Sequence, residues 1–176
     1  MKAYFMRHGQ TNYNVLKLCN DDPTRPVYLT EKGISQAEEA AQRLRGVKFD
    51  RIIVSELPRA RQTADIVNRH HGVPVNVHPG LNDFRTGLDG EAVSKLYETI
   101  ARDPMNTRIA GGETLTEHKQ RILRFIDWLR QQEDRVVMVV AHEETLRVVT
   151  AHFRRLSDEA MLALKFDNTE ILEFLL

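Results

Sequence analysis

A histidine between an arginine and a glycine directly follows the first apolar segment of the chain. Residues 2–6 are short, apolar and partly aromatic, which is typical of a β-strand, and Arg7, His8 and Gly9 come next. In open α/β sheets, ligands bind outside the carboxyl ends of the strands. An arginine at such an end offers a rigid set of donors for a phosphate or a carboxylate, and a histidine can act as a nucleophile or as an acid and base. This segment is therefore the first candidate for chemistry.

Other segments carry polar residues toward the same predicted edge of a sheet. The clearest buried strand of the sequence ends directly before His142, and another predicted strand ends at Ser55, with Arg59 shortly after it. A loop rich in glycine and proline supplies a carboxylate, Asp83. Because the carboxyl ends of parallel strands lie at one edge of a sheet, we expect these side chains to meet His8 on one face.

These segments resemble the motifs of the histidine phosphatase superfamily, the phosphoglycerate mutase-like proteins. The matching segments are Arg7-His8-Gly9-Gln10-Thr11 with Asn14, Leu29–Ala37, Ser55–Ala64, Leu81-Asn82-Asp83, Gly111-Gly112-Glu113-Thr114 and Val140-Ala141-His142. They follow one another in the order that the family has, and they span nearly the whole chain.

The resemblance implies a role for each matched residue. His8 would be the nucleophile and become a phosphohistidine, and Asp83 would protonate the leaving oxygen. The phosphoryl oxygens would be held by Arg7, Arg59 and His142, with help from Asn14, from Thr11 and from the backbone N–H of Glu143.

The physical demands of phosphoryl transfer agree with this assignment. The reaction asks a protein mainly for positioning and for charge that complements the phosphoryl oxygens, which two guanidinium groups and an imidazole supply without a metal or another cofactor. A covalent intermediate splits hydrolysis into two displacements, and a general acid adds typically ~10²–10⁴-fold. The predicted function is a metal-independent phosphatase that hydrolyses phosphomonoesters of a small substrate. Phosphoglycerate mutase-type transfer is the alternative, which the short chain disfavours because mutases of this family usually carry more chain.

Three carboxylates are candidates for the proton donor. The family generally has a glutamate at the position of Asp83, so this side chain is one methylene shorter. An aspartate after an asparagine in a loop is also typical of a turn. Asp89 and Glu113 lie nearby in the sequence and remain alternatives.

A pair of glutamates follows the second histidine, where the family commonly has glycine. In one alternative the Glu143 side chain reaches the mouth of the pocket, where it would compete with substrate phosphate for Arg7 and Arg59 and repel a bound phosphate. Two like charges ~4 Å apart at an effective dielectric near 20 repel by about 4 kcal/mol. We therefore expect the Glu143 side chain to turn away, with Glu143 and Glu144 opening a helix whose positive end stabilises carboxylates.

Two rival interpretations come from other classes of protein. One is a binding protein for phosphorylated ligands that kept the pocket and lost turnover through Asp83 and Glu143. The other is a metal site built from His8, His142 and Asp83. The two arginines of the motifs argue against it, because fixed cations repel a divalent metal. The remaining histidines lack a motif and are interpreted as structural or solvated: His70, His71, His78, His118 and His152.

The composition of the chain limits the classes of partner and the cellular compartment that we expect. The 176 residues carry 25 basic and 25 acidic side chains, so nothing indicates a nucleic-acid partner or a polybasic membrane surface. The only cysteine, Cys19, precludes an intramolecular disulfide and fits a reducing compartment. There is no leader-like segment at the start and no apolar run of membrane-spanning length, so we expect a cytoplasmic protein. Oligomeric state is left open.

The elements that must position these residues alternate along the chain. Strands are predicted at 2–6, 51–55, 75–77 and 136–141, and helices at 30–45, 58–71, 91–102, 114–129 and 144–153. Residues 103–112 read as irregular, and short strands at 162–166 and 170–174 are predicted to form an edge hairpin. This alternation predicts a single domain, residues 1–176, with a three-layer α/β/α sandwich fold and a mostly parallel central sheet.

Overall fold

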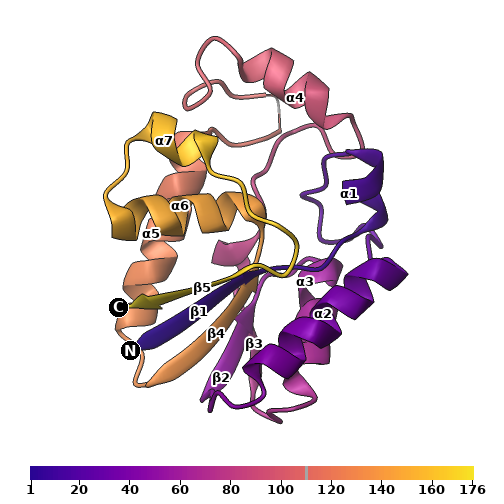
Figure 1. Ribbon diagram of the computed structural model, residues 1–176. Helices are drawn as coiled ribbons and strands as arrows, with labels where there is room; N and C mark the ends of the chain where they lie inside the picture. The colour runs from indigo at the N-terminus through magenta and orange to yellow at the C-terminus, as the bar shows by residue number, and fades with distance from the viewer. Residues whose placement is uncertain (110) are drawn as a thin grey trace.

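The computed structural model describes residues 1–109 and 111–176. Its elements, in chain order, are β1 (Lys2–Arg7), α1 (Asn12–Leu16), α2 (Glu31–Leu44), β2 (Arg51–Val54), α3 (Pro58–Asn68), β3 (Val75–Val77), the 3-10 helix η1 (Pro79–Leu81), α4 (Val93–Ile100), α5 (Leu115–Arg130), β4 (Val136–Ala141), α6 (Glu143–Arg154), α7 (Asp158–Ala163) and β5 (Ile171–Leu175) (Figure 1).

The strands form one sheet in the order β3-β2-β4-β1-β5. β4 pairs in parallel with β1 on one side and with β2 on the other, β2 pairs in parallel with β3, and β5 runs antiparallel to β1. Arg7 lies opposite Ala141, and Val54 lies opposite Val140. The carboxyl ends of β1, β2 and β4 therefore meet at one edge, and the predicted mostly parallel sheet is confirmed.

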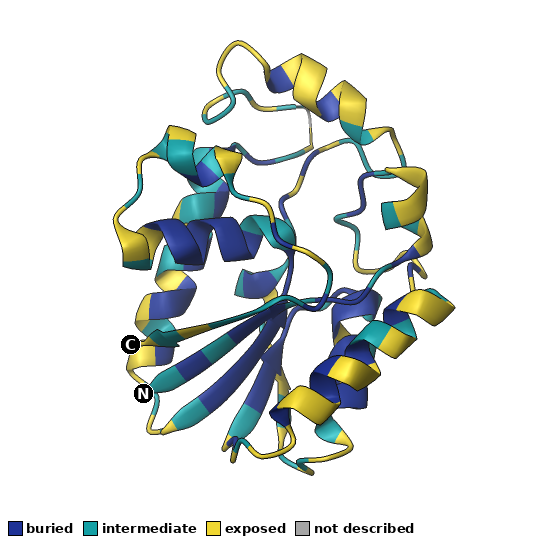
Figure 2. Ribbon diagram, in the orientation of Figure 1, coloured by how far each residue is buried: buried dark blue, intermediate teal, exposed yellow. Residues whose placement is uncertain are grey.

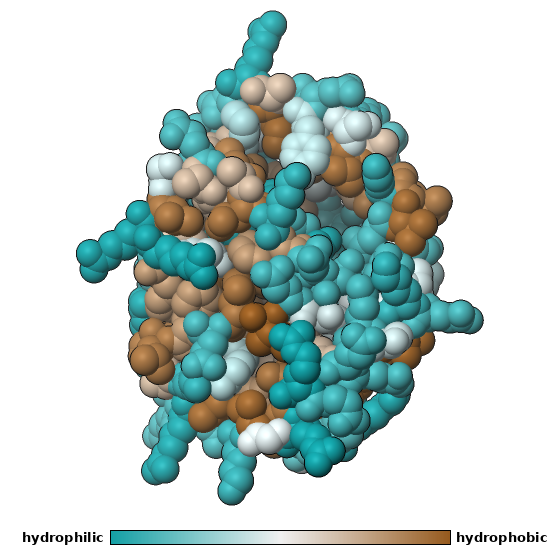
Figure 3. Space-filling view, viewed as in Figure 1, coloured by the Kyte–Doolittle hydropathy of each residue, from teal (hydrophilic) through white to brown (hydrophobic). Residues whose placement is uncertain are grey.

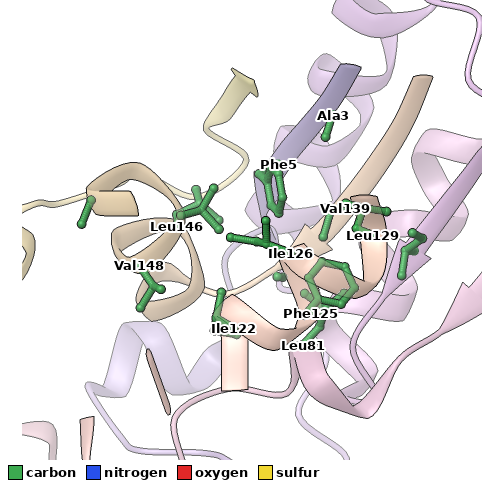
Figure 4. Packing of buried hydrophobic residues seen from close by; sticks show 14 of the residues in the cluster. Ala3, Phe5, Leu81, Ile122, Phe125, Ile126, Leu129, Val139, Leu146 and Val148 are labelled. Atoms are coloured by element: carbon green, nitrogen blue, oxygen red, sulfur yellow. The ribbon is translucent and has the colours of Figure 1, made fainter. Parts of the chain in front are cut away.

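Helices cover both faces of the sheet (Figure 1). Side chains alternate between the two faces along each strand, and apolar strands therefore present apolar side chains to the helices on both sides. Phe5 and Val139 pack with α5 and α6 in the cluster that Figure 4 shows. Met6 and Val140 point the other way and pack with α2 and α3. The central strands are accordingly buried along most of their length, whereas α2 exposes its outer side (Figure 2). The predicted three-layer sandwich is confirmed.

The loop after β1 and the start of α2 pack backbone against backbone. A Cβ atom at Gly33 would lie 2.0 Å from the carbonyl oxygen of Gln10, and one at Gly9 would lie 2.5 Å from the carbonyl oxygen of Gly33. Thr30 caps α2 and accepts a hydrogen bond from the N–H of Gly33 at 3.1 Å. Glycine at both contact positions thus fixes the path of the chain just beyond His8.

The predicted edge hairpin is wrong. Ser157 begins a helix instead, since its side chain accepts from the N–H of Ala160, and Asp158 and Glu159 follow in the first turn. Met161 is buried beside α6, so this helix packs on the core. β5 pairs with β1 alone, and residues 164–166 form neither helix nor strand. The helix α1 and the 3-10 helix η1 were also not predicted.

α4 lies apart from the sheet (Figure 1). Its Leu96 and Ile100 pack with Phe84, Leu115 and Cys19 in a cluster distinct from the two beside the sheet. Residues 103–109 and 111–112 contain no helix or strand, as predicted, and residue 110 of that segment lies outside the described residues. Among the described helices, none combines the length and the apolar composition that a membrane span requires.

Candidate active site

The register of β1 and β4 brings two histidines together at the edge of the sheet. His8 follows β1, and its N–H donates to the carbonyl of Ala141, the last residue of β4, at 3.0 Å. His142 comes next, and the two ring centroids are 5.3 Å apart. Both side chains are buried. The expectation that strand ends converge on one face is confirmed for this pair.

The contacts of His8 define its tautomer. Nδ1 lies 2.7 Å from the carbonyl oxygen of Gly9, which can only accept, so the proton is on Nδ1. Nε2 accepts a hydrogen bond from Nε of Arg59 at 3.0 Å. Burial lowers the pKa of His8 well below its ordinary value, and the charges of Arg59, His142 and Arg7 lower it further. The result is a neutral imidazole whose Nε2 lone pair is held beside a guanidinium group.

Arg59 is buried and held by partners on two loops. Nη2 donates to the backbone oxygen of Asn20 at 3.0 Å and to Oδ2 of Asp83 at 2.8 Å, and Nη1 donates to Oδ1 of Asn20. α3 supplies the arginine, directly after Pro58 at the first helical position. The guanidinium group is thereby fixed between His8 and Asp83.

His142 lies between Ser55 and Asp83. Its Nε2 is 2.8 Å from Oγ of Ser55, at the end of β2, and its Nδ1 is 3.5 Å from Oδ2 of Asp83. Nδ1 is buried and has no hydrogen-bond partner among the residues that the structure describes. Burial lowers the pKa of His142 well below its ordinary value, and the neighbouring Arg59 adds to this shift. His142 is therefore neutral, with one ring nitrogen open to a further partner.

Of the three carboxylates considered as proton donors, Asp83 is the one in the site. Glu113 is buried in an ion pair with Arg121, and it accepts from the N–H of Arg85 at 3.1 Å. Burial alone would raise the pKa of Glu113, but hydrogen bonds from His118 and Arg121 hold this pKa well below its usual range. Asp89 accepts from Asn20 and from the N–H of Asp21, and it pairs with Arg25. Neither of them lines the cavity described below.

The loop that carries Asp83 is anchored by an arginine of α5. Arg121 donates to the carbonyl oxygens of Gly80 at 3.0 Å, Asn82 at 2.8 Å and Asp83 at 3.1 Å. Its ion pair with Glu113 orients the guanidinium group. Arg121 is therefore a positioning residue for Asp83.

Thr11 and Asn14 form the N-terminal cap of α1. Oδ1 of Asn14 accepts from the N–H of Thr11 at 2.9 Å, and Oγ1 of Thr11 accepts from the N–H of Asn14 at 3.1 Å. Both residues line the cavity. The amide NH₂ of Asn14 is the group left to meet a ligand, so contact with substrate stays a prediction for these two residues.

The expectation that Glu143 turns away is wrong. Its Oε2 lies 2.9 Å from Nη1 of Arg7, and its Oε1 lies 3.1 Å from Nη2 of Arg147. The alternative, in which Glu143 competes for an arginine of the pocket, is the arrangement found for Arg7, because the attraction of Arg7 and Arg147 outweighs a repulsion that arises only when a phosphate is bound. Glu143 and Glu144 do open a helix, α6, as predicted. Binding through the backbone N–H of Glu143 stays a prediction.

A cavity of about 160 Å³ is lined by His8, Arg59 and Asp83, whereas the buried His142 is not part of its lining. The face seen in Figure 3 is hollowed below α4, over the carboxyl ends of the strands. The residues that line the cavity and that the sequence indicated are Arg7, His8, Thr11, Asn14, Arg59, Asp83 and Glu143. Arginine side chains, a neutral imidazole and a carboxylate in so small a space suit a single phosphoryl group.

Comparison with known proteins agrees with this geometry. A family model described as histidine phosphatase superfamily (branch 1) matches residues 3–175. The chain belongs to the histidine phosphatase superfamily. It is an enzyme of the phosphatase and phosphoglycerate mutase-like class, as its motifs indicated.

Relatives within the superfamily differ in their named activities. An adenosylcobalamin/alpha-ribazole phosphatase from Escherichia coli is 31% identical over 179 residues, which cover 96% of this chain and 86% of that protein. A protein of Erwinia tasmaniensis named "Probable phosphoglycerate mutase GpmB" is 28% identical, over 97% of this chain and 83% of its own. The crystal structure of the alpha-ribazole phosphatase from Shigella flexneri superimposes with a TM-score of 0.89 at 28% identity, covering 98% of this chain and 89% of that one.

Several residues of this histidine phosphatase site were not indicated by the motifs. Asn20 lies in an irregular loop, and Arg121 lies on a helix, so neither has a local signal. Arg147 does have a local signal in the sequence. It lies four residues after Glu143 and three after Glu144 on one helix, and this spacing pairs opposite charges.

The contacts of His8 also bear on the metal interpretation. Its Nδ1 is engaged with the carbonyl of Gly9, and its Nε2 receives the N–H of Arg59. A metal ion on Nε2 would have to displace a guanidinium group and remain beside its charge. The arrangement therefore favours an anionic ligand.

Proposed function

We propose that this chain is a metal-independent phosphatase that hydrolyses phosphomonoesters through a phosphohistidine at His8. The observation that carries the proposal is the neutral His8, with its Nε2 lone pair 3.0 Å from Nε of Arg59 inside a small polar cavity. A phosphoryl group would draw the Arg59 donor from this lone pair onto its own oxygens, which frees Nε2 to attack phosphorus.

The reaction runs in two displacements. Nε2 of His8 attacks phosphorus, and the bond from phosphorus to the ester oxygen breaks. Asp83 enters this step as the carboxylic acid, after Arg59 has turned to the phosphoryl oxygens, and gives its proton to the leaving oxygen. In the second step Asp83 takes a proton from water as the water oxygen attacks phosphorus. The bond to Nε2 then breaks, which releases inorganic phosphate and restores neutral His8.

Charge stabilisation is assigned to the arginines and to His142. Arg7 and Arg59 face the equatorial oxygens as fixed cations. The Nδ1 atom of His142 is buried and unpartnered among the described residues, and a dianionic phosphoryl group beside it would favour the protonated, donating form. Asn14, Thr11 and the backbone N–H of Glu143 complete the proposed binding set.

The substrate, the domain organisation and the cellular location belong to the same proposal. The substrate would be a small phosphorylated molecule, as the names of the phosphatase relatives indicate for those proteins. Residues 1–176 would act as a single domain without a cofactor. The single cysteine fits a reducing compartment, so the cytoplasm is the proposed location.

Trapping the intermediate tests the proposal. Rapid quenching with ³²P-labelled substrate is expected to capture an adduct that is labile in acid and stable in base. His8→Ala should abolish it, and strong chelators should leave turnover unchanged. An adduct that persists in His8→Ala would refute the assignment, and an enzyme that binds phosphate without any turnover would be the weakened binding protein.

Phosphoryl transfer to a second acceptor is the alternative function, because relatives named as phosphoglycerate mutases match 97% of the chain. The same phosphohistidine would serve both reactions. Incubation with phosphoglycerate separates them, since a phosphatase releases inorganic phosphate and a mutase interconverts the isomers.

A further inference from the structure

A second cavity, of about 440 Å³, adjoins the one that holds the proposed catalytic residues. It lies between α4, α5 and α7, and its apolar lining is formed by Phe84, Leu96, Ile100, Ala101, Leu115 and Leu162. It is nearly three times as large as the phosphoryl cavity and falls within the usual size range of ligand pockets.

The two cavities are neighbours that share part of their walls. Phe84, Leu96, Tyr97 and Glu144 line both of them. Phe84 directly follows Asp83, and its N–H donates to Oδ1 of that carboxylate at 2.9 Å. A leaving oxygen that receives a proton from Asp83 therefore has the second cavity beside it, in the direction of Phe84.

The charged side chains at the rim of the second cavity, Glu144 and Arg147, largely neutralise each other. Arg147 lines the second cavity, but its Nη1 lies 2.8 Å from Glu144 and its Nη2 lies 3.1 Å from Glu143. Lys165 is exposed to solvent at the edge. Among the described lining residues, no buried cation is left to receive an acidic group.

We propose that the second cavity is the leaving-group subsite and that it selects esters whose leaving group is uncharged and largely apolar. The proposal rests on the phosphatase function above and adds a substrate class to it. The apolar walls favour a hydrocarbon or ring, because removing such a group from water is favourable. Glu143 and Glu144 disfavour a carboxylate, because they already occupy Arg7 and Arg147.

Two features of the rim support this selection. Tyr97 is half-exposed and lines both cavities, so its ring can cover a flat leaving group. Burial raises the pKa of Glu144 to about 7. The charge of Arg147 opposes this shift only in part, and the negative charges of Asp83 and Glu143 add to it. An added negative charge at this position would meet the same unfavourable surroundings.

A matched series of alkyl phosphates tests the proposal, because the leaving alcohols have similar basicity. Ethyl phosphate, hexyl phosphate and 6-phosphonooxyhexanoate differ in apolar length and in terminal charge. Burial of methylene groups is worth roughly tenfold for every two groups. We expect kcat/KM for hexyl phosphate to exceed that for ethyl phosphate by at least about tenfold, and the acid to lose most of this gain.

Variants locate the effect. Ala101→Trp fills the second cavity from the end of α4 and should reduce the ratio of kcat/KM for hexyl phosphate to kcat/KM for ethyl phosphate toward one. Arg102→Trp is the control, because the next residue does not line the cavity, and it should keep the wild-type ratio. Glu144→Gln should narrow the difference between hexyl phosphate and the acid.

Two outcomes would overturn the inference while leaving the phosphatase function intact. One is an enzyme that forms the phosphohistidine and hydrolyses all three esters equally. The other is a hexyl preference that Ala101→Trp and Arg102→Trp retain alike. If neither the adduct nor hydrolysis of any ester is found, the proposed function itself fails.

Discussion

Arg7, which is proposed to bind the phosphoryl group, already has an ionic partner. Its Nη1 is 2.9 Å from Glu143, and the two side chains are 15% and 24% exposed, so a phosphate must compete with a carboxylate that is already in place. Burial and nearby cations keep His8, the proposed nucleophile, neutral, while its Nε2 accepts from Arg59. In the proposed mechanism, both Arg7 and Arg59 must therefore exchange a present partner for the phosphoryl group.

Removal of the Glu143 charge is expected to strengthen phosphate binding. Glu143→Gln should lower the inhibition constant of inorganic phosphate by about tenfold, because a partly exposed ion pair is worth up to about 1 kcal/mol and a direct repulsion is also lost. Competitive inhibition of aryl phosphate hydrolysis measures this constant. Glu144→Gln is the matched control, with less than about threefold change expected, since Glu144 contacts Arg147 and not Arg7. An unchanged constant in Glu143→Gln would show that the carboxylate does not compete.

Replacement of Asp83 should discriminate between leaving groups. Asp83→Asn is expected to slow hydrolysis of an alkyl phosphate by about 10²–10³-fold and that of an aryl phosphate much less, because a phenolate leaves without full protonation. Single-turnover rates with both esters provide the comparison. Glu113→Gln serves as a reference, since it disturbs the Arg121 anchor and should affect both esters alike. Equal losses in Asp83→Asn would assign Asp83 a structural role.

The side chains of the candidate site are positioned by the ends of strands and by the segments packed against them. β1 and β4 run in register to Arg7 and Ala141, so the residues that follow them emerge side by side. The chain beyond β1 is then held by the start of α2. This packing requires that Gly33 carry no side chain, because a Cβ would lie 2.0 Å from the carbonyl oxygen of Gln10.

A methyl group at this contact is expected to force the helix and the loop apart. Gly33→Ala should reduce the free energy of unfolding by about 2–3 kcal/mol and reduce kcat, since overpacking a close contact shifts the backbone. Urea denaturation measures the first effect. Gly46→Ala, just after the same helix, is the control, because no described atom lies within 4 Å of the position that its Cβ would take and its backbone lies outside the left-handed region. Equal stability of the two variants would contradict this account.

On the scale of the whole molecule, the apolar interior has separate parts. Two large clusters lie on the faces of the sheet, one small cluster includes Leu96 and Ile100 of α4, and another includes Ala37 of α2 and Ile66 of α3. Both cavities lie where α4 and its loops face the sheet edge. This arrangement leaves several titratable groups buried near one another, so the stability of the fold depends on pH.

Glu144 should contribute to this dependence with a defined sign. Its folded pKa of about 7 exceeds the ordinary value of 4.5, so its contribution to stability is present below about pH 4.5 and is lost as the pH rises through 7. Relative to Glu144→Gln, the wild type should lose up to about 3 kcal/mol of unfolding free energy between pH 5 and pH 8. Urea denaturation across this range tests the expectation. Parallel pH profiles of the two proteins would exclude it.

The sequence by itself determined the parallel strands, the longer helices and which polar residues lie at the strand ends. Strongly apolar strands such as 136–141 and caps such as Thr114 are local signals, and His8 and His142 follow strands that a parallel sheet must align. The strand predicted at 162–166 is wrong because the helix cap at Ser157 and the packing of Met161 on α6 outweigh a weak strand pattern.

Tertiary structure alone decided which partners surround these residues. Asn20 and Arg121 reach Arg59 and the Asp83 loop from segments far away in the chain, so no local pattern could reveal them. Glu143 faces Arg7 because β1 and α6 bring two arginines to one carboxylate. Local periodicity specifies what each element is, whereas the balance of charges in a pocket depends on where loops and helices from the whole chain come together.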